Sequence, residues 1–571
     1  MKKTLLTILA LTAALALTAC AGAGANGSGT TAAPAATVSL TAESPATQAP
    51  ESAAGSETAA ASTDDTVFRI SGPAGGVSES GNVYTLTAAG TYVLTGTLTE
   101  GQIVVAAGES DEVVLELSGV SLTSASDSPI RVNSADKVKI KAAEGTVNTV
   151  TDARPLKTAE SDTAGEAAIY ALCDLDLSGK GTLTVTASYH NGIQTKDDLS
   201  VKNLTLSVTA PNTALKGNDS VTVESGAVTA VSTAGDGVKT DNSDLSAKEN
   251  QRGTVTVSGG TVTIYAACDG IDAAYNVEIS GDPTLTVATH TYSSYTAATA
   301  KKTTVSSGVT KSAESAKGIK AGNAVTISGG TVTILSMDDG IHANGGEKLG
   351  NGAVALGNVT VSGGSVSITA ADDGVHADGA LLIEGGSLDV TESHEGMEGH
   401  TVTVNGGEIR VYATDDGVNA AASSGGKSDG LITVNGGKLT VEVAGRDVDG
   451  IDANGSYRQT GGFVVVSNPN ADASGNMSAV DADGTVTVTG GVIVALGTVP
   501  GTQRGGGRFG MGGMNAGSSL PSGYVTFSGT LAAGEHTFTF GDTSETFSLK
   551  SPVTGGWIWA SGVTADGYTL K

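Results

Sequence analysis

The sequence predicts an all-β protein, a parallel β-helix or solenoid of roughly a dozen coils followed by a small C-terminal β segment. Glycine accounts for 81 of the 571 residues and aromatic residues for only 4%, while no long helical pattern of Leu, Glu and Lys is present. Short segments of alternating apolar and polar residues recur about every 21 residues. Such strands are too short to bury a face alone, so they must stack on equivalent strands of neighbouring repeats.

Each repeat combines two motifs. The first is an Asp-Gly-Ile/Val motif, as in "SMDDGIHANG" (336–345), "ADDGVHADG" (371–379) and "ATDDGVNAA" (413–421). The second is a pair of alternating strands around Gly-Gly, as in "VTISGGTVTI" (325–334) and "VTVSGGSVSI" (359–368). We expect the motif glycine to form a corner with positive φ and the branched residue after it to point inward. The members of this glycine series include Gly217, Gly340, Gly374 and Gly417.

Stacked repeats would place the polar residues that flank each motif glycine in columns along one edge. Carboxylates about 5 Å apart repel one another unless they are solvated, share protons or bind cations. Aspartate also caps turns through its own backbone, and this role explains any single one of them. The ensemble, however, favours Ca²⁺, which accepts six to eight oxygen ligands in loose geometry. The candidate metal ligands are Asp236, Asp269, Asp272, Asp338, Asp339, Asp372, Asp373, Asp415, Asp416, Asp449 and Asp452.

Histidine and lysine side chains interrupt the acidic columns and are candidates for ligand binding. His342 and His376 are expected to be adjacent, with Glu398 next. This ladder is open to two interpretations: a transition-metal site, or an exposed stack that contacts a ligand by hydrogen bonds. Lys239 and Lys320 flank the acidic column and are either ion-pair partners of its aspartates or the base of a Ca²⁺-dependent lyase.

The net charge of −28 argues against nucleic acid and against direct attraction to an anionic membrane. If the ligand is itself anionic, a cation must lie between the two. We find no G-x-S-x-G motif, no credible Cys/His pair and no phosphate-cradling loop in the sequence. No catalytic residue is therefore assigned.

The N-terminus is expected to be a lipoprotein signal peptide, residues 1–20. Lys2 and Lys3 precede a short apolar segment, and "LTAC" (17–20) resembles a bacterial lipobox in which Cys20 is lipidated. The alternative is an ordinary secretory signal with a chance cysteine. The lipobox interpretation predicts an extracytoplasmic protein attached to the membrane only through its lipid, at the bacterial cell surface.

The rest of the chain divides by composition. We expect an Ala/Ser/Thr-rich disordered tether (21–64), an N-terminal cap with the first strands (65–125), the parallel β-helix (126–500), a Gly-rich loop (501–520) and a C-terminal β cap (521–571). Cys173 and Cys268 are expected to be buried thiols outside any disulfide framework.

One phrase is much richer than a glycine repeat: "GTLTVTASYHNGIQTKDDL" (181–199), which follows "GTYVLTGTLTEGQIVVAAGESDEVV" (90–114). With these segments the chain resembles a bacterial family of secreted, β-helical carbohydrate-binding proteins over residues 67–500. The resemblance implies a right-handed parallel β-helix, similar in fold to pectate lyases, that carries Ca²⁺ and binds cellulose-like and acidic plant polysaccharides such as polygalacturonate.

Within that resemblance an acidic glycan is favoured over cellulose. Neutral glucans need flat aromatic platforms, and the chain offers few candidates: Tyr265, Tyr275, Tyr412, Tyr457 and at most one of Trp557 and Trp559. The leading hypothesis is a non-catalytic, surface-anchored polysaccharide-binding protein. The alternatives are a Ca²⁺-dependent, pectate-lyase-like lyase and a structural surface adhesin.

Overall fold

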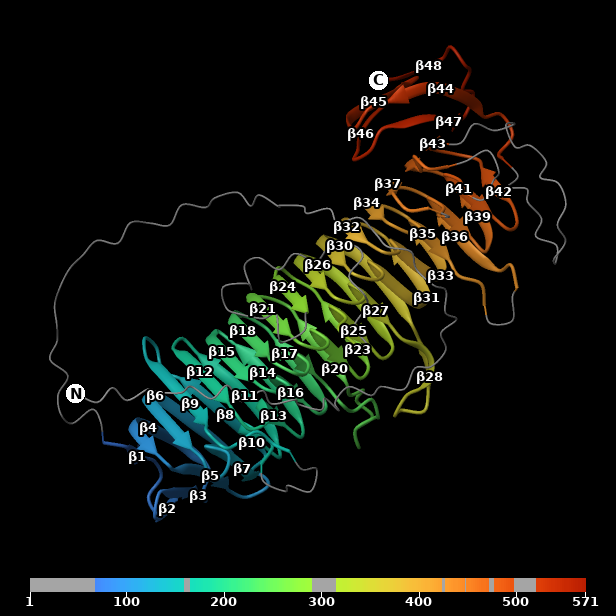
Figure 1. Ribbon diagram of the computed structural model, residues 1–571. Helices are drawn as coiled ribbons and strands as arrows, with labels where there is room; N and C mark the ends of the chain where they lie inside the picture. The colour runs from blue at the N-terminus through green and yellow to red at the C-terminus, as the bar shows by residue number, and fades with distance from the viewer. Residues whose placement is uncertain are drawn as a thin grey trace, which may run out of the picture.

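The described part of the chain is built from β-strands. In the computed structural model the described residues are 67–158, 165–289, 315–423, 427–446, 448–471, 477–497 and 520–571. They contain no helix, which confirms the all-β prediction, and so none that could span a membrane. Figure 1 shows the strands stacked side by side from the N-terminal to the C-terminal end of an elongated molecule. The lipobox with Cys20, the tether and residues 501–519 of the Gly-rich loop lie outside the described residues.

Three parallel ladders run along the stack, and one strand from each makes a coil. The pairing of β13 with β10 on one side and β16 on the other is typical. The first ladder consists of β7 (Ile130–Ser134), β10 (Ala167–Ala171), β13 (Asn191–Thr195), β16 (Leu215–Gly217), β19 (Val238–Lys239), β22 (Ile271–Ala273), β25 (Ile319–Ala321), β27 (Ile341–Ala343), β31 (Val375–Ile383), β33 (Met397–Val404), β35 (Val418–Ala420), β38 (Ile451–Ala453) and β41 (Val480–Ala482).

The second ladder uses the later halves of β31 and β33, because these two strands run through two ladders. Its other strands are β8 (Lys137–Ala142), β11 (Asp174–Gly179), β14 (Asp198–Lys202), β17 (Ser220–Val223), β20 (Thr254–Val257), β23 (Asn276–Ile279), β26 (Ala324–Ser336), β30 (Asn358–Ala370), β36 (Gly430–Val434), β39 (Gly455–Gln459) and β42 (Val486–Val488).

The third ladder shares β26 and β30 with the second, since each bends at its Gly-Gly pair and continues. Its other strands are β9 (Val147–Asp152), β12 (Thr182–Ala187), β15 (Leu204–Ala210), β18 (Gly226–Ser232), β21 (Thr261–Ala266), β24 (Thr284–Thr289), β32 (Ser387–Ser393), β34 (Glu408–Ala413), β37 (Lys438–Val443), β40 (Phe463–Ser467) and β43 (Val492–Leu496).

Both ends of the stack carry antiparallel strands. At the N-terminal end these are β1–β4 and β2–β3, and parallel pairing of β4 with β6 begins the stack. At the C-terminal end β47 pairs antiparallel with β43 and β44. The strands are β1 (Arg69–Ser71), β2 (Val77–Ser80), β3 (Val83–Leu86), β4 (Gly90–Thr99), β5 (Gln102–Ala106), β6 (Glu112–Ser124), β44 (Val525–Leu531), β45 (Gly534–Phe540), β46 (Thr543–Leu549), β47 (Val553–Ala560) and β48 (Tyr568–Leu570). A hairpin of β28 (Gly345–Lys348) and β29 (Val354–Leu356) projects from the first corner after β27.

The core is a set of aliphatic columns inside the coils. Ile341, Val375 and Val418 are completely buried, and Ile341 is in register with Val375. This confirms that the residue after each motif glycine points inward. Because each strand alternates inward and outward residues, the same register sends the next residue of each strand to the surface.

The corner glycines are required for a different reason from the one predicted. Gly340 and Gly374 do not have positive φ. A Cβ atom on Gly340 would instead lie 2.5 Å from the carbonyl oxygen of Gly374 and 2.3 Å from Cγ2 of Ile368, so close coil stacking excludes a side chain. Positive φ occurs at the second glycine of the Gly-Gly pairs, as at Gly330 (80°).

The predicted corner at Gly217 is wrong. Gln194 is in register with Lys216, and Lys216 with Lys239. Ala214 therefore occupies the corner position of this coil, in place of Gly217. Asp219 lies outside the column, where it is buried and pairs with Arg252 Nε at 2.5 Å.

Candidate functional site

The outward side chains of the first ladder, together with the residues before the corner glycines, form what we call the polar edge. Successive strands bring the outward residues into register, so that they form one column. In order, this column contains Lys239, Asp272, Lys320, His342, His376, Glu398, Asn419, Asp452 and Asp481. Beside it, before the corners, lie Asp236, Asp269, Lys317, Asp339, Asp373, Glu395, Asp416 and Asp449.

Five of the six aspartates before the corners bind the next coil through Oδ1: Asp236, Asp269, Asp339, Asp416 and Asp449. The Oδ1 atom of Asp236 accepts a hydrogen bond from the backbone N–H of Asp269 at 3.1 Å. Asp416 Oδ1 accepts one from the N–H of Asp449 at 2.7 Å, and Asp449 Oδ1 accepts one from the N–H of Ser478 at 2.5 Å. These aspartates therefore satisfy backbone donors of the neighbouring coil.

In the N-terminal half of the polar edge, lysines bind the remaining carboxylate oxygens. Lys239 Nζ lies 2.8 Å from Asp236 Oδ2 and 2.6 Å from Asp272 Oδ2. Lys320 Nζ lies 3.2 Å from Asp269 Oδ2 and 3.5 Å from Asp272 Oδ1. Burial alone would lower the pKa of both lysines, but the charges of these aspartates outweigh it and raise both pKa values. Lys239 and Lys320 therefore keep their protons and act as internal counter-ions.

Two further cations continue the pattern at the next coils. Lys317 pairs with Asp339 and lies 3.3 Å from Asp338 Oδ2. His342 Nδ1 lies 2.6 Å from Asp339 Oδ2. Burial opposes ionisation of Asp339, but the hydrogen bond from His342 and the charge of Lys317 outweigh it and lower the pKa of this carboxyl.

His342 and His376 stack with ring centroids 4.4 Å apart and planes 5° from parallel. His376 Nδ1 lies 2.5 Å from Asp373 Oδ2, which repeats the contact of His342 with its own aspartate one coil away. Both Nε2 atoms face Asp378, whose Oδ1 lies 3.5 Å from that of His342 and 3.2 Å from that of His376.

The C-terminal half of the polar edge contrasts sharply with this arrangement. Among the described residues, no lysine or arginine forms an ion pair with its carboxylates: Glu395, Glu398, Asp415, Asp416, Asp449, Asp452 and Asp481. The nearest ring nitrogens are those of His376, 3.9 Å from Glu398, and of His394, 3.6 Å from Asp415.

The pKa values report this shortage of positive charge. Burial, reinforced by the charges of Asp416, Asp449 and Asp481, raises the pKa of Asp452 to about 8. Burial and the charge of Asp481 raise that of Asp449 to about 7, although hydrogen bonds from Ser478 act in the opposite direction. The carboxylates thus resist ionisation unless a cation joins them.

Glu395 extends this acidic group toward the preceding coil. Burial, together with the neighbouring Glu398, raises its pKa. Glu395, His394 and Asp415 each offer a ligand atom within 4.8 Å of those of the other two. Asn419 Nδ2 lies 3.5 Å from Glu395 Oε2, so the amide also belongs to this cluster.

The first aspartate of each Asp-Asp pair has a separate environment. Asp338 is 2% exposed and belongs to the lysine-paired half, whereas Asp372 and Asp415 are only partly buried. The paired aspartates therefore do not form equivalent two-carboxylate sites on every coil.

Sequence reasoning missed Asp378 and Asp481. Asp378 lies two residues after His376 on the same face of β31, a spacing that alternation alone gives. Asp481 is in register with Asp452, but Ala479 stands where the motif glycine was expected, so the repeat was not recognised there.

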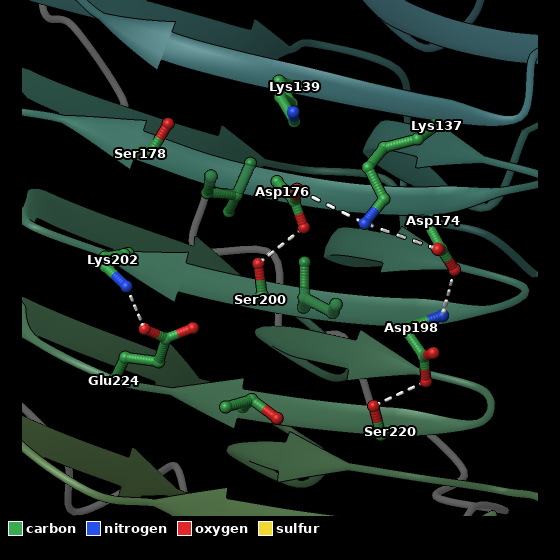
Figure 2. A pocket seen from close by; sticks show the side chains of 13 residues that line it. Lys137, Lys139, Asp174, Asp176, Ser178, Asp198, Ser200, Lys202, Ser220 and Glu224 are labelled. Atoms are coloured by element: carbon green, nitrogen blue, oxygen red, sulfur yellow. Dashed lines mark hydrogen bonds and ion pairs between the residues drawn. The ribbon is translucent and has the colours of Figure 1, made fainter. Parts of the chain in front are cut away.

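A second polar surface lies on the second ladder. An open cleft of about 490 Å³ lies across β8, β11, β14 and β17, and Figure 2 shows the side chains that line it. Its lysines are already paired: Lys137 lies 3.6 Å from both Asp174 and Asp176, and Lys139 lies 2.8 Å from Glu112. The cleft is thus a surface of balanced charge.

The predicted aromatic candidates are covered or only partly exposed, and Tyr265 and Tyr275 belong to the partly exposed ones. Tyr457 is fully buried, and Trp557 and Trp559 are 3% and 8% exposed. The Tyr412 ring is covered by Lys550 Nζ, 3.7 Å from its centroid. No aromatic side chain among the described residues is exposed.

Fold and polar edge together define an all-β repeat protein with a long charged surface. The chain belongs to the family of carbohydrate-binding domain-containing proteins, whose model matches residues 80–358 and 354–445. A carbohydrate-binding domain-containing protein of Acetivibrio thermocellus is 39% identical over 136 residues, which cover 24% of this chain and 48% of that relative. The match thus spans about half the length of this curated relative.

A solved structure also matches. It is that of a polysaccharide lyase-like protein from C. thermocellum, in a gadolinium derivative. The sequence identity is 36%, the TM-score is 0.34, and the match covers 37% of this chain and 86% of the other.

Proposed function

We propose that this protein binds polysaccharide without cleaving it, and that Ca²⁺ on the C-terminal half of the polar edge links it to an acidic glycan of the polygalacturonate type. Family membership supports a carbohydrate partner. One observation carries the rest: five of the six aspartates before the corners use Oδ1 for the neighbouring coil. Lys239, Lys317, Lys320 or histidine meets their Oδ2 only in the N-terminal half.

Calcium suits the acidic half because carboxylate and amide oxygens are its ordinary ligands. Asp449, Asp452 and Asp481 supply carboxylates there, and Asn454, which donates a hydrogen bond through Nδ2 to Asp452 Oδ2 at 3.3 Å, brings an amide group beside them. A Ca²⁺ ion replaces the protons that the raised pKa values retain. It also removes the repulsion between a protein of net charge −28 and an anionic glycan.

Non-catalytic binding is favoured over a lyase by the state of the two candidate bases. A base must give up its proton near neutral pH, whereas the pKa values of Lys239 and Lys320 are raised by their aspartate partners. The proposal also includes right-handed winding of the coils, the hand that parallel strand crossovers almost always adopt. Surface attachment through lipid on Cys20 completes it.

The test is retention of the full chain on immobilised polygalacturonate, in Ca²⁺ and after chelation, with cellulose in parallel. We expect retention on polygalacturonate only with Ca²⁺, and loss of roughly 10-fold or more in affinity for Asp449→Asn combined with Asp452→Asn. Glu112→Gln combined with Glu224→Gln removes the same number of carboxylates near the Figure 2 cleft and is expected to bind normally.

Three other outcomes would overturn the proposal. Retention that survives chelation would exclude the calcium bridge. A rise in ultraviolet absorbance from unsaturated uronates would indicate a lyase. Absence of retention on both glycans would leave a structural adhesin.

A further inference from the structure

We propose that His342, His376 and Asp378 form a binding site for one divalent transition-metal ion of the zinc type, separate from the calcium-binding half of the polar edge. The three side chains come from β27 and β31, which are adjacent rungs of the first ladder. The Nε2 atoms of the two histidines both lie within 3.5 Å of Oδ1 of Asp378.

The Nδ1 contacts prepare both rings for a metal. A metal-binding histidine characteristically donates its other ring N–H to a carboxylate, which fixes the tautomer and strengthens the ligand. His342 Nδ1 does so to Asp339 at 2.6 Å, and His376 Nδ1 to Asp373 at 2.5 Å. With Nδ1–H held by the carboxylate, a metal ion displaces the proton from Nε2, and the lone pair of Nε2 is then presented toward Asp378.

The spacing at the Nε2 atoms, which allows ion pairs with Asp378 in the metal-free protein, is also that of ligands sharing one metal ion. Asp378 Oδ1 lies 3.5 Å and 3.2 Å from them, clearly farther than the Nδ1 contacts. Two ligands of a tetrahedral ion with bonds near 2.1 Å lie ~3.4 Å apart. Because parallel rings direct their lone pairs along parallel lines, we expect binding to tilt the rings toward Asp378.

The groups around His342, His376 and Asp378 are held by other partners, so an ion can bind between these three side chains. Asp378 Oδ2 accepts the N–H of Gly345 at 2.7 Å, which orients Oδ1 toward the histidines. The neighbouring Lys320 is held by Asp269 and Asp272. The side chains of His342, His376 and Asp378 are 14%, 25% and 38% exposed, so an ion can enter from solvent and keep a position for water or a sugar hydroxyl. Imidazole with one carboxylate suits zinc-type ions, whereas Ca²⁺ prefers oxygen alone.

The test is titration of the full chain with Co²⁺ in Ca²⁺-containing buffer without glycan. We expect the visible absorption of four-coordinate cobalt at one ion per chain, and its loss on addition of Zn²⁺. His376→Gln is expected to weaken binding roughly 100-fold and Asp378→Asn roughly 10-fold or more. His400→Gln, a change at a histidine whose Nδ1 contacts the backbone oxygen of Ala421 at 3.0 Å, serves as the control and is expected to bind as wild type.

Asp373→Asn separates a metal site from a simple ion-pair ladder. Its amide is a poorer acceptor for the ring N–H of His376, and we expect about 10-fold weaker Co²⁺ binding with an unchanged fold by circular dichroism. Absence of a cobalt signal, or equal binding by wild type and His376→Gln, would overturn the proposal. Neither result bears on glycan retention, so this site and the calcium proposal fail or stand separately.

Discussion

A single aspartate of the polar edge has two oxygens with two different tasks. In Asp449 the Oδ1 atom receives the backbone N–H of Ser478, and an asparagine would do this equally well. The structural task therefore does not explain why the residue is acidic. Asp236 shows the second task, since its Oδ2 faces Lys239. A carboxylate, unlike an amide, can therefore bind a positively charged partner through its second oxygen.

Asp452 provides the prediction at this scale. Its pKa is raised to about 8 in the folded protein by burial and by neighbouring carboxylates, against an unfolded value of about 4. Below pH 4 both states hold the proton and its destabilising charge is absent. As the pH rises toward 8, the unfolded state loses the proton more readily, so the free energy of unfolding falls.

We therefore expect the Ca²⁺-free protein to lose stability between about pH 4 and pH 8. Asp452→Asn is expected to stabilise it at pH 8 by roughly 2 kcal/mol, because a neutral amide cannot ionise and because water screens part of the repulsion at this half-buried position. Denaturant unfolding at pH 4.5 and pH 8 measures the effect. A variant that is less stable than wild type at pH 8 would contradict it.

At the scale of the coil, periodicity in the sequence was sufficient to predict the strands and which of their residues point inward. Alternation around Gly-Gly predicts β26 and β30, and the inward position of Ile341 follows from it. The corner conformation was not predictable, because the exclusion of Cβ at Gly340 arises from the carbonyl of the next coil. Contacts between coils, which no single repeat contains, decide that position.

The candidate site was predicted in part for the same reason. The columns of acidic residues follow from the repeat. The division of the polar edge into a lysine-paired half and a half without lysine partners does not. It depends on which lysine reaches which carboxylate across coils, as Lys320 reaches Asp269 and Asp272. Asp378 was missed because it belongs to the continuation of β31, beyond the motif.

A change at Lys239 tests whether this lysine takes the place that a bound metal ion would have between Asp236 and Asp272. It joins the coils of β19 and β22 through Asp236 and Asp272, both largely buried. Lys239→Met is expected to lower stability by about 3 kcal/mol, because Asp236 then remains without a counter-ion and Asp272 keeps only its longer contact with Lys320. Added Ca²⁺ is expected to restore part of this loss, whereas it has little effect on these coils in wild type. Thermal unfolding of both proteins in Ca²⁺ and in chelator measures it, and a loss that Ca²⁺ leaves unchanged would contradict the prediction.

At the scale of the whole molecule, the stack makes ligand effects local. One continuous core runs from β3 through β43, yet each coil contacts mainly its two neighbours, so stabilisation of one coil spreads weakly along the rod. Figure 1 shows that β25, in the lysine-paired half, and β35, in the acidic half, lie at different levels of the stack. A cation bound to the acidic half is therefore expected to protect that half selectively.

Hydrogen exchange of the full chain provides the measurement. At a Ca²⁺ concentration 100 times the dissociation constant, binding to the folded state contributes about 2.7 kcal/mol, which slows exchange through the opening it suppresses by roughly 100-fold. We expect this protection in β33, β35 and β38, where the carboxylates lack lysine partners, and little change in β13 and β16. Asp449→Asn combined with Asp452→Asn is expected to abolish it. Equal protection at both ends of the rod, or protection confined to β19–β25, would mean that lysine pairing does not decide where the cation binds.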